Sequence, residues 1–245
     1  MRKFGLIGFP LGHSFSKKYF TEKFQHECIK DALFENFEME RIHKLKELIQ
    51  REPDLRGLNV TIPHKQTVIP YLDELDEAAR GIGAVNVIKV SSGKLRGYNT
   101  DYIGFMRSLI PLVKSSHKKA LVLGTGGSAK AVKYVLKKIG ISYTLVSRNP
   151  NDKSVLRYSD ITSDLLQEYT VLINTTPAGM YPKISEAPDI PYQHIGSQHL
   201  LFDLIYNPEE TLFLKYGKQP GASVKNGYEM LVFQAEEAWR IWGGF

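Results

Sequence analysis

A glycine-rich loop between an apolar strand and a helix constrains the fold of this chain more than any other feature. The buried strand ALVLG precedes the loop and the amphipathic helix AKAVKYVLKKIG follows it. The loop, 124–129 (GTGGSA), satisfies G-x-G-x-x-[GA] in the strand–loop–helix context that the motif requires. Gly124 permits the tight turn, Gly126 leaves room for a pyrophosphate, and Ala129 allows the helix to pack closely on the sheet. We expect phosphates at this helix N-terminus, the alternative being a tight turn without a ligand.

The residues at the end of the strand after this helix indicate whether NAD or NADP binds. About 20 residues beyond the first glycine, an NAD site offers Asp or Glu to the ribose 2′-hydroxyl. Here TLVSRNP offers Ser147 and Arg148 and no acid. A carboxylate would repel a 2′-phosphate, whereas a guanidinium pairs with it through two hydrogen bonds. These residues favour NADP, with a solvated surface arginine as the alternative for Arg148.

Strands and helices alternate along the chain, which indicates parallel sheets with right-handed crossovers. The polar segment 115–119 (SSHKK) separates two such regions, so we predict two α/β domains. Strands are expected at 3–8, near 32–39, at 55–62, at 84–90 and 94–98 as a hairpin, and at 120–124, 142–147, 169–174 and 199–205. Helices are expected at 17–30, about 43–51, 73–83, from 101 to about 114, at 129–140 and at about 227–242.

The composition is that of an ordinary globular protein. The 245 residues are 42% hydrophobic and 24% charged, which excludes disorder, collagen and a disulfide scaffold. A single cysteine, Cys28, forms no internal disulfide, and no His/Cys cluster has zinc spacing, so we expect a cytoplasmic protein without a metal. The start, MRKFGLIGFPLG, is broken by glycines and a proline and indicates a buried strand rather than a signal peptide. No apolar run reaches the roughly 18 residues of a membrane helix.

The net charge of +6 comes from 32 Lys and Arg against 26 Asp and Glu. The lysines are spread along the chain, without the basic stripe and interleaved aromatics of a nucleic-acid surface. A mildly basic surface also suits a small anionic substrate or a phosphorylated cofactor. We therefore expect a small-molecule partner, neither nucleic acid nor membrane.

Polar side chains follow several of the predicted strands, where open sheets place their sites. Each has an ordinary alternative, such as a helix cap or a satisfied core amide. Together they form a set of neutral donors and acceptors with one lysine and one aspartate, which suits a small polyhydroxylated molecule. They are Ser14, Ser16, Asn59, Thr61, Lys65, Asn86, Asp101 and Gln234.

The order of these motifs resembles the shikimate dehydrogenases of the shikimate/quinate dehydrogenase family. The blocks, covering nearly the whole chain, are GFPLGHSFS, NVTIPHK, AVN, NTD, GTGGSAK, NTTPAGM, DLIYNP and NGYEMLVFQA. The resemblance implies NADP-dependent, reversible reduction of 3-dehydroshikimate to shikimate, in aromatic amino-acid biosynthesis. It also implies a substrate domain with a mostly parallel sheet (1–103 and 226–245, joined by a returning C-terminal helix), a Rossmann-type NADP domain (104–225), and a monomer or homodimer.

The resemblance also implies a role for each matching residue. Lys65 and Asp101 would be the catalytic pair. Shikimate would be bound by Ser14, Ser16, Asn59, Thr61, Asn86, Tyr206 and Gln234. NADP would be bound by Gly124, Gly126, Gly127, Ser128, Ala129, Ser147, Arg148, Thr175, Gly227 and Met230.

The chain departs from the family pattern at two points. Lys17 stands where the family's H-S-x-S-P has proline, and Asp152 stands where a second arginine commonly follows the first. A carboxylate near the expected 2′-phosphate weakens the preference for NADP. This segment keeps one rival open, a quinate/shikimate dehydrogenase that accepts NAD. The other alternative is a non-catalytic dinucleotide-binding regulatory protein, which would be expected to lack Lys65 or Asp101.

Overall fold

The computed structural model describes residues 1–12, 15–150 and 152–243, which divide into two compact units, 1–100 with 235–245 and 101–234. The elements of the first unit are β1 (Arg2–Gly8), α1 (Phe15–His26), β2 (Ala32–Glu38), η1 (Ile42–Lys44), α2 (Leu45–Arg51), β3 (Leu55–Val60), α3 (His64–Thr67), η2 (Ile69–Tyr71), β4 (Glu74–Leu75), α4 (Glu77–Ile82), β5 (Val87–Ser91) and β6 (Lys94–Tyr98).

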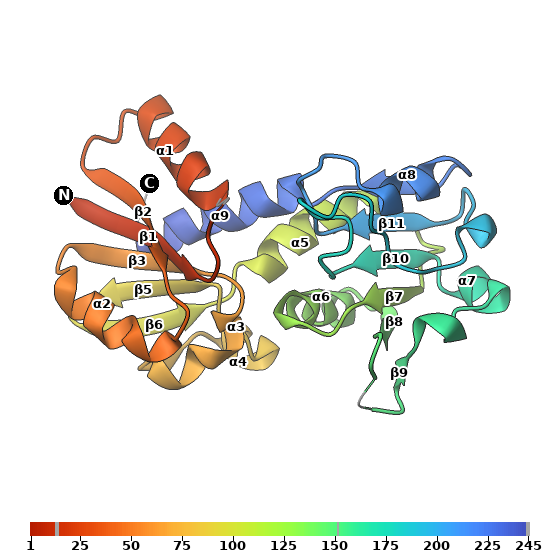
Figure 1. The fold of residues 1–245 in the computed structure, drawn as a ribbon, viewed down its shortest axis with the longest axis horizontal. Coiled ribbons are helices and arrows are strands. Elements are labelled where there is room, and N and C mark those ends of the chain that lie inside the picture. Colours follow the sequence, from red (N-terminus) through yellow and green to blue (C-terminus); the bar gives the residue numbers. More distant parts are fainter. Residues whose placement is uncertain (13–14, 151, 244–245) are drawn as a thin grey trace. The chain divides into compact units, whose positions relative to one another are not determined.

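The first unit is built on a six-stranded sheet with the order β2-β1-β3-β5-β6-β4 (Figure 1). Strands β2, β1 and β3 are parallel, whereas β5 runs antiparallel to both β3 and β6. One face packs against α2 through Leu45 and Leu48, and the other against α1 through Phe20 and Phe24. This mixed sheet has two buried faces, as the near-continuous apolar strands require.

The C-terminal end of the chain completes the core of the first unit. Trp239 and Trp242, near the end of α9 (Tyr228–Trp242), pack on Phe4, with ring centroids 5.2 and 5.1 Å away. The indole of Trp242 donates to the Ile88 carbonyl at 2.9 Å, and its ring lies against Gly57 so closely that a side chain there would collide with it. Two indoles filling one apolar cluster contribute several kcal/mol to stability, on the order of 3–5 each.

The second unit holds a six-stranded, fully parallel sheet with the order β12-β11-β10-β7-β8-β9 (Figure 1). Its elements are α5 (Asp101–Leu109), η3 (Ile110–Leu112), β7 (Lys119–Leu123), α6 (Gly127–Lys138), β8 (Ser142–Val146), β9 (Val155–Leu156), η4 (Tyr158–Asp160), α7 (Ser163–Glu168), β10 (Val171–Asn174), η5 (Tyr192–His194), β11 (Leu200–Asp203), α8 (Leu212–Lys218), β12 (Ser223–Lys225) and the first part of α9. One face of this sheet packs against α5 and α6, and the other against α7 and α8. The two units confirm the predicted α/β class with a Rossmann-type second sheet.

Several expected elements differ in the structure, and the strands expected at 55–62, 169–174 and 199–205 are shorter, at Leu55–Val60, Val171–Asn174 and Leu200–Asp203. The helix expected at 17–30 ends at His26, and α4 covers only 77–82 of the expected 73–83, because Glu74 and Leu75 pair with β6 instead. The helix expected to reach 114 ends at Leu109, where Pro111 cannot continue it. The strand expected at 84–90 begins at Val87.

No helix of the described ranges 1–12, 15–150 and 152–243 is long and apolar enough to cross a bilayer. Over the same ranges, no cluster of three or more His, Cys, Asp or Glu side chains has the arrangement of a metal site.

Candidate functional site

The glycine loop has the geometry that a pyrophosphate needs. Gly124 has φ +107°, and a Cβ there would lie 2.6 Å from Thr175 Oγ1, so only glycine fits. At Gly126 a Cβ would meet no heavy atom within 4 Å, which means that the loop faces open space at this point. Gly126 precedes α6, and no described side chain caps the free N–H groups of that helix. These N–H groups and the positive end of the helix are free to bind phosphate oxygens.

The rest of the loop holds α6 against the sheet. Ala129 is 1% exposed and belongs to the apolar cluster between the helix and the strands, as the third position of the motif requires. Ser128 lies in the first turn of α6 and is half-buried. The residues therefore fit a dinucleotide.

The end of β8 carries the side chains that distinguish the two cofactors. Ser147 is held by a hydrogen bond from its N–H to the Leu156 carbonyl at 2.9 Å, and Arg148 beside it is exposed. No carboxylate of the described ranges forms an ion pair with Arg148. Asp152 accepts a hydrogen bond from Ser154 N–H at 2.8 Å, which lowers the pKa of its carboxyl group. Arg148 is thus available to a phosphate, while an ionised carboxylate stands four residues farther on.

Three further candidates lie where β10, β11 and β12 end. Thr175 donates from Oγ1 to the Leu123 carbonyl at 2.7 Å, so it lies directly beside the glycine loop. Gly227 contacts the backbone of Leu204 so closely that any side chain would collide with it. Tyr206 is half-buried, and burial raises the pKa of its phenol. The second unit therefore brings these candidates to the carboxyl-terminal edge of its sheet, where open parallel sheets bind ligands.

The helices of the second unit place Asp101, Met230 and Gln234. Asp101 is buried and is the first residue of α5, where the helix dipole favours a negative charge. Gly104 in α5 contacts the Met230 carbonyl of α9, an approach that a Cβ would prevent. Gln234, 7% exposed, donates to the Leu231 carbonyl at 2.8 Å within α9.

In the first unit, Lys65 lies in the short helix α3 and is half-buried. Two hydrogen bonds hold this turn, one from the neighbouring His64 side chain and one to the Lys65 carbonyl. His64 Nε2 lies 2.6 Å from the Met39 carbonyl, and the Lys65 carbonyl accepts from Val85 N–H at 2.7 Å. Lys65 is therefore presented by a rigid turn, although Asp101, its expected partner, belongs to the other unit.

The two candidate asparagines differ sharply. Asn86 is held at both ends of its amide: Nδ2 donates to Thr100 Oγ1 at 2.9 Å, and Oδ1 accepts from Thr100 N–H at 2.6 Å. It precedes β5 rather than lying within a strand, which explains how an apolar segment accommodates an amide. Asn59 is 4% exposed, and its Oδ1 has no hydrogen-bond partner in the described structure. An unpaired buried acceptor is costly, so Asn59 is suited to a ligand donor.

The remaining candidates of the first unit are Thr61, Ser16 and Ser14. Thr61 is half-buried at the end of β3, and its N–H donates to the Ile7 carbonyl at 2.9 Å. Ser16 is half-buried in the first turn of α1. Ser14 lies outside the described residues.

Comparison with known proteins identifies the family of the chain. The model of the shikimate dehydrogenase substrate binding domain matches residues 6–88. A shikimate dehydrogenase (NADP(+)) from Desulforamulus reducens is 37% identical, covering 98% of this chain and 89% of that protein, and one from Clostridium beijerinckii is 43% identical, covering 99% and 92%.

The chain belongs to the shikimate dehydrogenase family.

A solved structure supports this membership at the level of the fold. The shikimate dehydrogenase of Thermus thermophilus, in complex with NADP(H) and shikimate, superposes with a TM-score of 0.87 at 28% identity, covering 100% of this chain and 94% of that one.

Two further polar residues of this shikimate dehydrogenase family member, Asn36 and Asp203, are not marked by any sequence motif. Asn36 in β2 lies in register with Leu6, which is itself in register with Asn59, so the two asparagines flank Leu6 on one face. Asn36 Oδ1 is also buried without a described partner. Asp203, at the end of β11, is completely buried. Nothing local marks either residue, because the position of Asn36 depends on the register of the folded strands and Asp203 resembles a helix-capping or surface aspartate.

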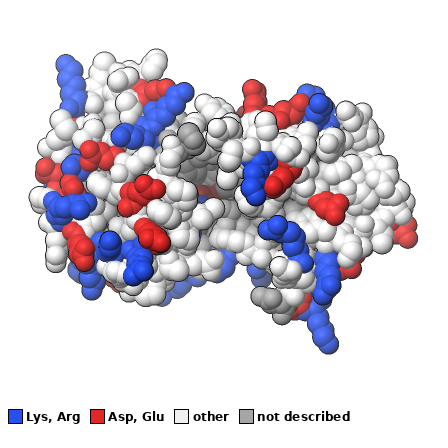
Figure 2. Space-filling view, viewed as in Figure 1, with Lys and Arg blue, Asp and Glu red and all other residues white. Residues whose placement is uncertain are grey.

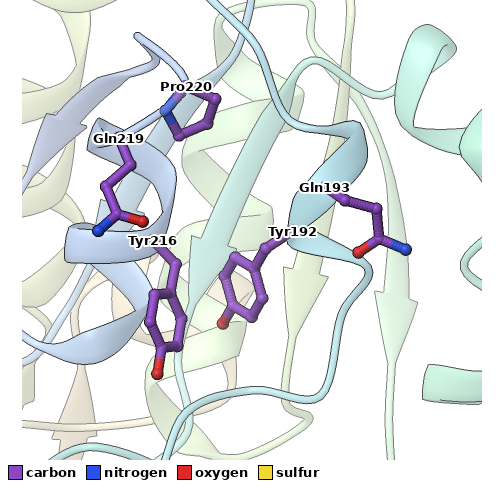
Figure 3. A pocket seen from close by; sticks show the side chains of 5 residues that line it. All are labelled: Tyr192, Gln193, Tyr216, Gln219 and Pro220. Carbon is purple, nitrogen blue, oxygen red and sulfur yellow. The ribbon is translucent and has the colours of Figure 1, made fainter.

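A surface hollow of about 540 Å³ lies apart from these candidates. It is lined by Tyr192, Gln193, Tyr216, Gln219 and Pro220. The rings of Tyr192 and Tyr216 lie side by side, with centroids 5.0 Å apart (Figure 3). The lining comes from the segments just before β11 and β12, at the amino-terminal edge of the sheet. Because ligands of open parallel sheets bind at the opposite edge, this hollow is not the dinucleotide site.

Proposed function

We propose that this chain catalyses the NADP-dependent, reversible reduction of 3-dehydroshikimate to shikimate, a step of aromatic amino-acid biosynthesis. The observation that carries the proposal is the uncapped N-terminus of α6 beneath the open loop at Gly126, in a chain of the shikimate dehydrogenase family. The enzyme is thus an NADP-dependent oxidoreductase acting on a secondary alcohol.

The second unit supplies the residues for NADP. Gly124, Gly126, Gly127, Ser128 and Ala129 form the loop and first turn that hold the pyrophosphate. Ser147 and Arg148 hold the 2′-phosphate, and Thr175, Gly227 and Met230 border the nicotinamide. When bound, NADPH supplies a hydride, and the protein supplies orientation and charge.

Lys65 and Asp101 act on the substrate. The Lys65 ammonium stabilises the negative charge that develops on the substrate oxygen and donates a proton to it. The Asp101 carboxylate accepts a hydrogen bond from a substrate hydroxyl or from Lys65 and thereby orients both. In the oxidative direction the neutral Lys65 amine takes that proton back from the substrate hydroxyl as the hydride leaves the alcohol carbon for the cofactor.

The other proposed substrate residues recognise the carboxylate and the hydroxyls. Ser14 and Ser16 donate to the carboxylate, and the unpaired Oδ1 of Asn59 accepts from a hydroxyl. Asn86, whose amide is fixed by two hydrogen bonds to Thr100, is a further proposed contact of the substrate. Thr61, Tyr206 and Gln234 complete the set. A pocket built from such groups rejects analogues that lack the hydroxyls.

We assign substrate binding to the domain 1–103 with 226–245, and NADP binding to the domain 104–225. The structure's own division into 1–100 with 235–245 and 101–234 supports a two-domain enzyme of this kind. The proposed location is the cytoplasm, which suits the single free thiol of Cys28. The proposed assembly is a monomer or homodimer.

One observation favours a second candidate, a quinate/shikimate dehydrogenase that also accepts NAD. The carboxylate of Asp152 stands in the segment after Arg148, and the hydrogen bond from Ser154 lowers its pKa. A negative charge there opposes the 2′-phosphate but leaves a ribose hydroxyl unaffected.

The initial rate of NADPH formation, followed at about 340 nm, tests the proposal. Purified enzyme is mixed with shikimate or quinate and, in parallel, NADP⁺ or NAD⁺. We expect a high rate with shikimate and NADP⁺ alone. Comparable rates with NAD⁺ or quinate would establish the second candidate. Folded protein that is inactive in all four mixtures would refute both and indicate a regulatory dinucleotide-binding protein.

A further inference from the structure

A completely buried carboxylate lies where β10 and β11 end. Asp203 closes β11, and Asn174 closes β10 directly beside it in register. Both residues are 0% exposed. No lysine, arginine or histidine of the described ranges forms an ion pair with Asp203. A buried carboxylate without a counter-ion is costly, so its hydrogen bonds must account for its presence.

Asp203 accepts three hydrogen bonds. Oδ2 accepts from Thr211 Oγ1 at 2.6 Å, and Oδ1 accepts from Asn174 Nδ2 and from Ile205 N–H, both at 3.0 Å. Thr211 is in turn the N-cap of α8, accepting from Leu214 N–H. The carboxylate thereby ties two neighbouring strands to the start of a helix.

These bonds extend to the segments that carry the proposed cofactor and substrate residues. Asn174 Oδ1 accepts from Thr176 N–H at 3.0 Å and from Thr176 Oγ1 at 2.7 Å, which fixes the turn that contains Thr175. The Ile205 carbonyl accepts from Gly227 N–H at 2.9 Å. Asp203 therefore reaches Thr176, Tyr206 and Gly227 through at most one intervening residue.

We propose that Asp203 is a positioning residue of this enzyme, whose carboxylate aligns the segments 174–176, 205–206 and, through Ile205, Gly227 for hydride transfer. The proposal rests on the proposed function, which places Thr175, Tyr206 and Gly227 around the nicotinamide and the substrate. Only a carboxylate can accept from all three donors at once. An asparagine would present its own N–H groups to one of them and break that bond. The ionised carboxylate, which predominates above about pH 7, also makes charge-assisted hydrogen bonds that are stronger than neutral ones, which makes the alignment stiff.

Two pairs of variants test this role. Asp203→Asn replaces one acceptor oxygen by a donor, and Asp189→Asn makes the same chemical change at an exposed carboxylate of the same unit. Thr211→Val removes the hydroxyl that donates to Asp203 with little change of shape, and Thr211→Ser keeps it. The threonine pair decides the question if Asp203→Asn fails to fold.

The first readout compares, for each variant, the change in kcat with the change in the dissociation constant of NADP⁺. We expect Asp203→Asn and Thr211→Val to lower kcat by about 10- to 100-fold, the effect of misplacing reacting groups by a fraction of an ångström or more. The dissociation constant of NADP⁺, measured by calorimetry, should change by less than about threefold, because the α6 N-terminus that binds phosphate is left intact. Asp189→Asn and Thr211→Ser should match the wild type.

The second readout needs no activity. Amide hydrogen exchange at Thr176, Ile205 and Gly227 should be at least about tenfold faster in the ligand-free Asp203→Asn protein, with Leu121 and Val122 of β7 unchanged. Unchanged exchange at the three amides would overturn the positioning role, as would faster exchange with unaltered kcat. An inactive wild type would refute the proposed function instead, and exchange would still decide whether Asp203 orders these segments.

Discussion

Among single residues, Lys65 carries the largest share of the proposed chemistry, because it combines a positive charge with a proton that it can donate. We expect Lys65→Ala to lower kcat by about 10²- to 10⁴-fold, the usual contribution of a proton donor, with little change in the KM for shikimate. Lys46→Ala, at an exposed lysine of α2, is the matched control and should retain full activity. A large rise in KM at unchanged kcat would show that Lys65 only binds.

Asp203 makes a separate prediction about stability. Burial raises the pKa of its carboxyl group to about 7, whereas an unfolded aspartate titrates near 3.9. Between these values the folded state retains a proton that the unfolded state has lost. The free energy of unfolding therefore falls as pH rises through this window, by up to about 1.4 kcal/mol per pH unit, and this contribution is constant above about pH 7.

The amide of Asp203→Asn does not titrate, so the variant isolates this contribution. We expect the free energy of unfolding of the wild type, minus that of the variant, to fall between about pH 5 and 7 and to level off above it. Urea denaturation at a series of pH values measures the difference. A difference that is constant throughout would mean that the folded carboxyl has an ordinary pKa.

At the level of elements, two glycines of the same loop are expected to serve different purposes. Gly126 leaves space for the cofactor, whereas Gly124 is needed for the fold of the loop. A Cβ at Gly126 meets nothing in the protein, so Gly126→Ala should leave the melting temperature within about 2 °C of the wild type. The same methyl group enters the space for the pyrophosphate, and the dissociation constant of NADP⁺ should rise at least tenfold, or about 1.4 kcal/mol.

Gly124→Ala is the counterpart. Its φ of +107° and the contact with Thr175 Oγ1 predict a loss of roughly 1–3 kcal/mol of stability, seen as a lower melting temperature. Thermal melts and calorimetry on the two variants provide the comparison. Equal NADP⁺ affinity in Gly126→Ala and the wild type would place the pyrophosphate elsewhere.

Elements with a local signal were predictable from the sequence. The hairpin turn at Ser92 and Gly93 has φ of 50° and 76°, as its polar tip indicated, and the strand–loop–helix unit around Gly124 lies where the motif placed it. The helix expected at 73–83 was wrong at its start, because Glu74 and Leu75 gain strand pairing with β6, a partner that local periodicity cannot reveal.

In the candidate site, too, residues with a local sequence signal were predictable and residues that depend on distant partners were not. The position of Asn59 at the end of a predicted strand and the family resemblance singled it out, and in the described structure its Oδ1 is buried without a hydrogen-bond partner. Asn36 and Asp203 could not be found in this way, because their significance depends on register across strands and on complete burial. Both are properties of the folded sheet rather than of the neighbouring residues.

At the level of the whole molecule, the net charge of +6 favours the approach of anions. Lysine and arginine side chains are interspersed with acidic ones on the face shown in Figure 2, so the attraction is diffuse. We expect kcat/KM to fall as ionic strength rises from about 0.01 to 0.15 M, where the Debye length shortens from about 30 to 8 Å. The fall should be steeper for NADP⁺ than for shikimate, which carries less charge, with kcat itself unchanged. A kcat/KM that is independent of salt would contradict this.

We propose above all that this chain transfers hydride between NADP and a shikimate-type alcohol. The two sheets, the loop at Gly126 and the turn at Lys65 support this proposal. The most direct test is to incubate the enzyme with 3-dehydroshikimate and NADPH that carries deuterium at both hydrogen positions of the nicotinamide C4, and to analyse the product by mass spectrometry. We expect the product to be shikimate that carries deuterium on the carbon of the former ketone. Unchanged 3-dehydroshikimate, or shikimate without the label, would contradict it.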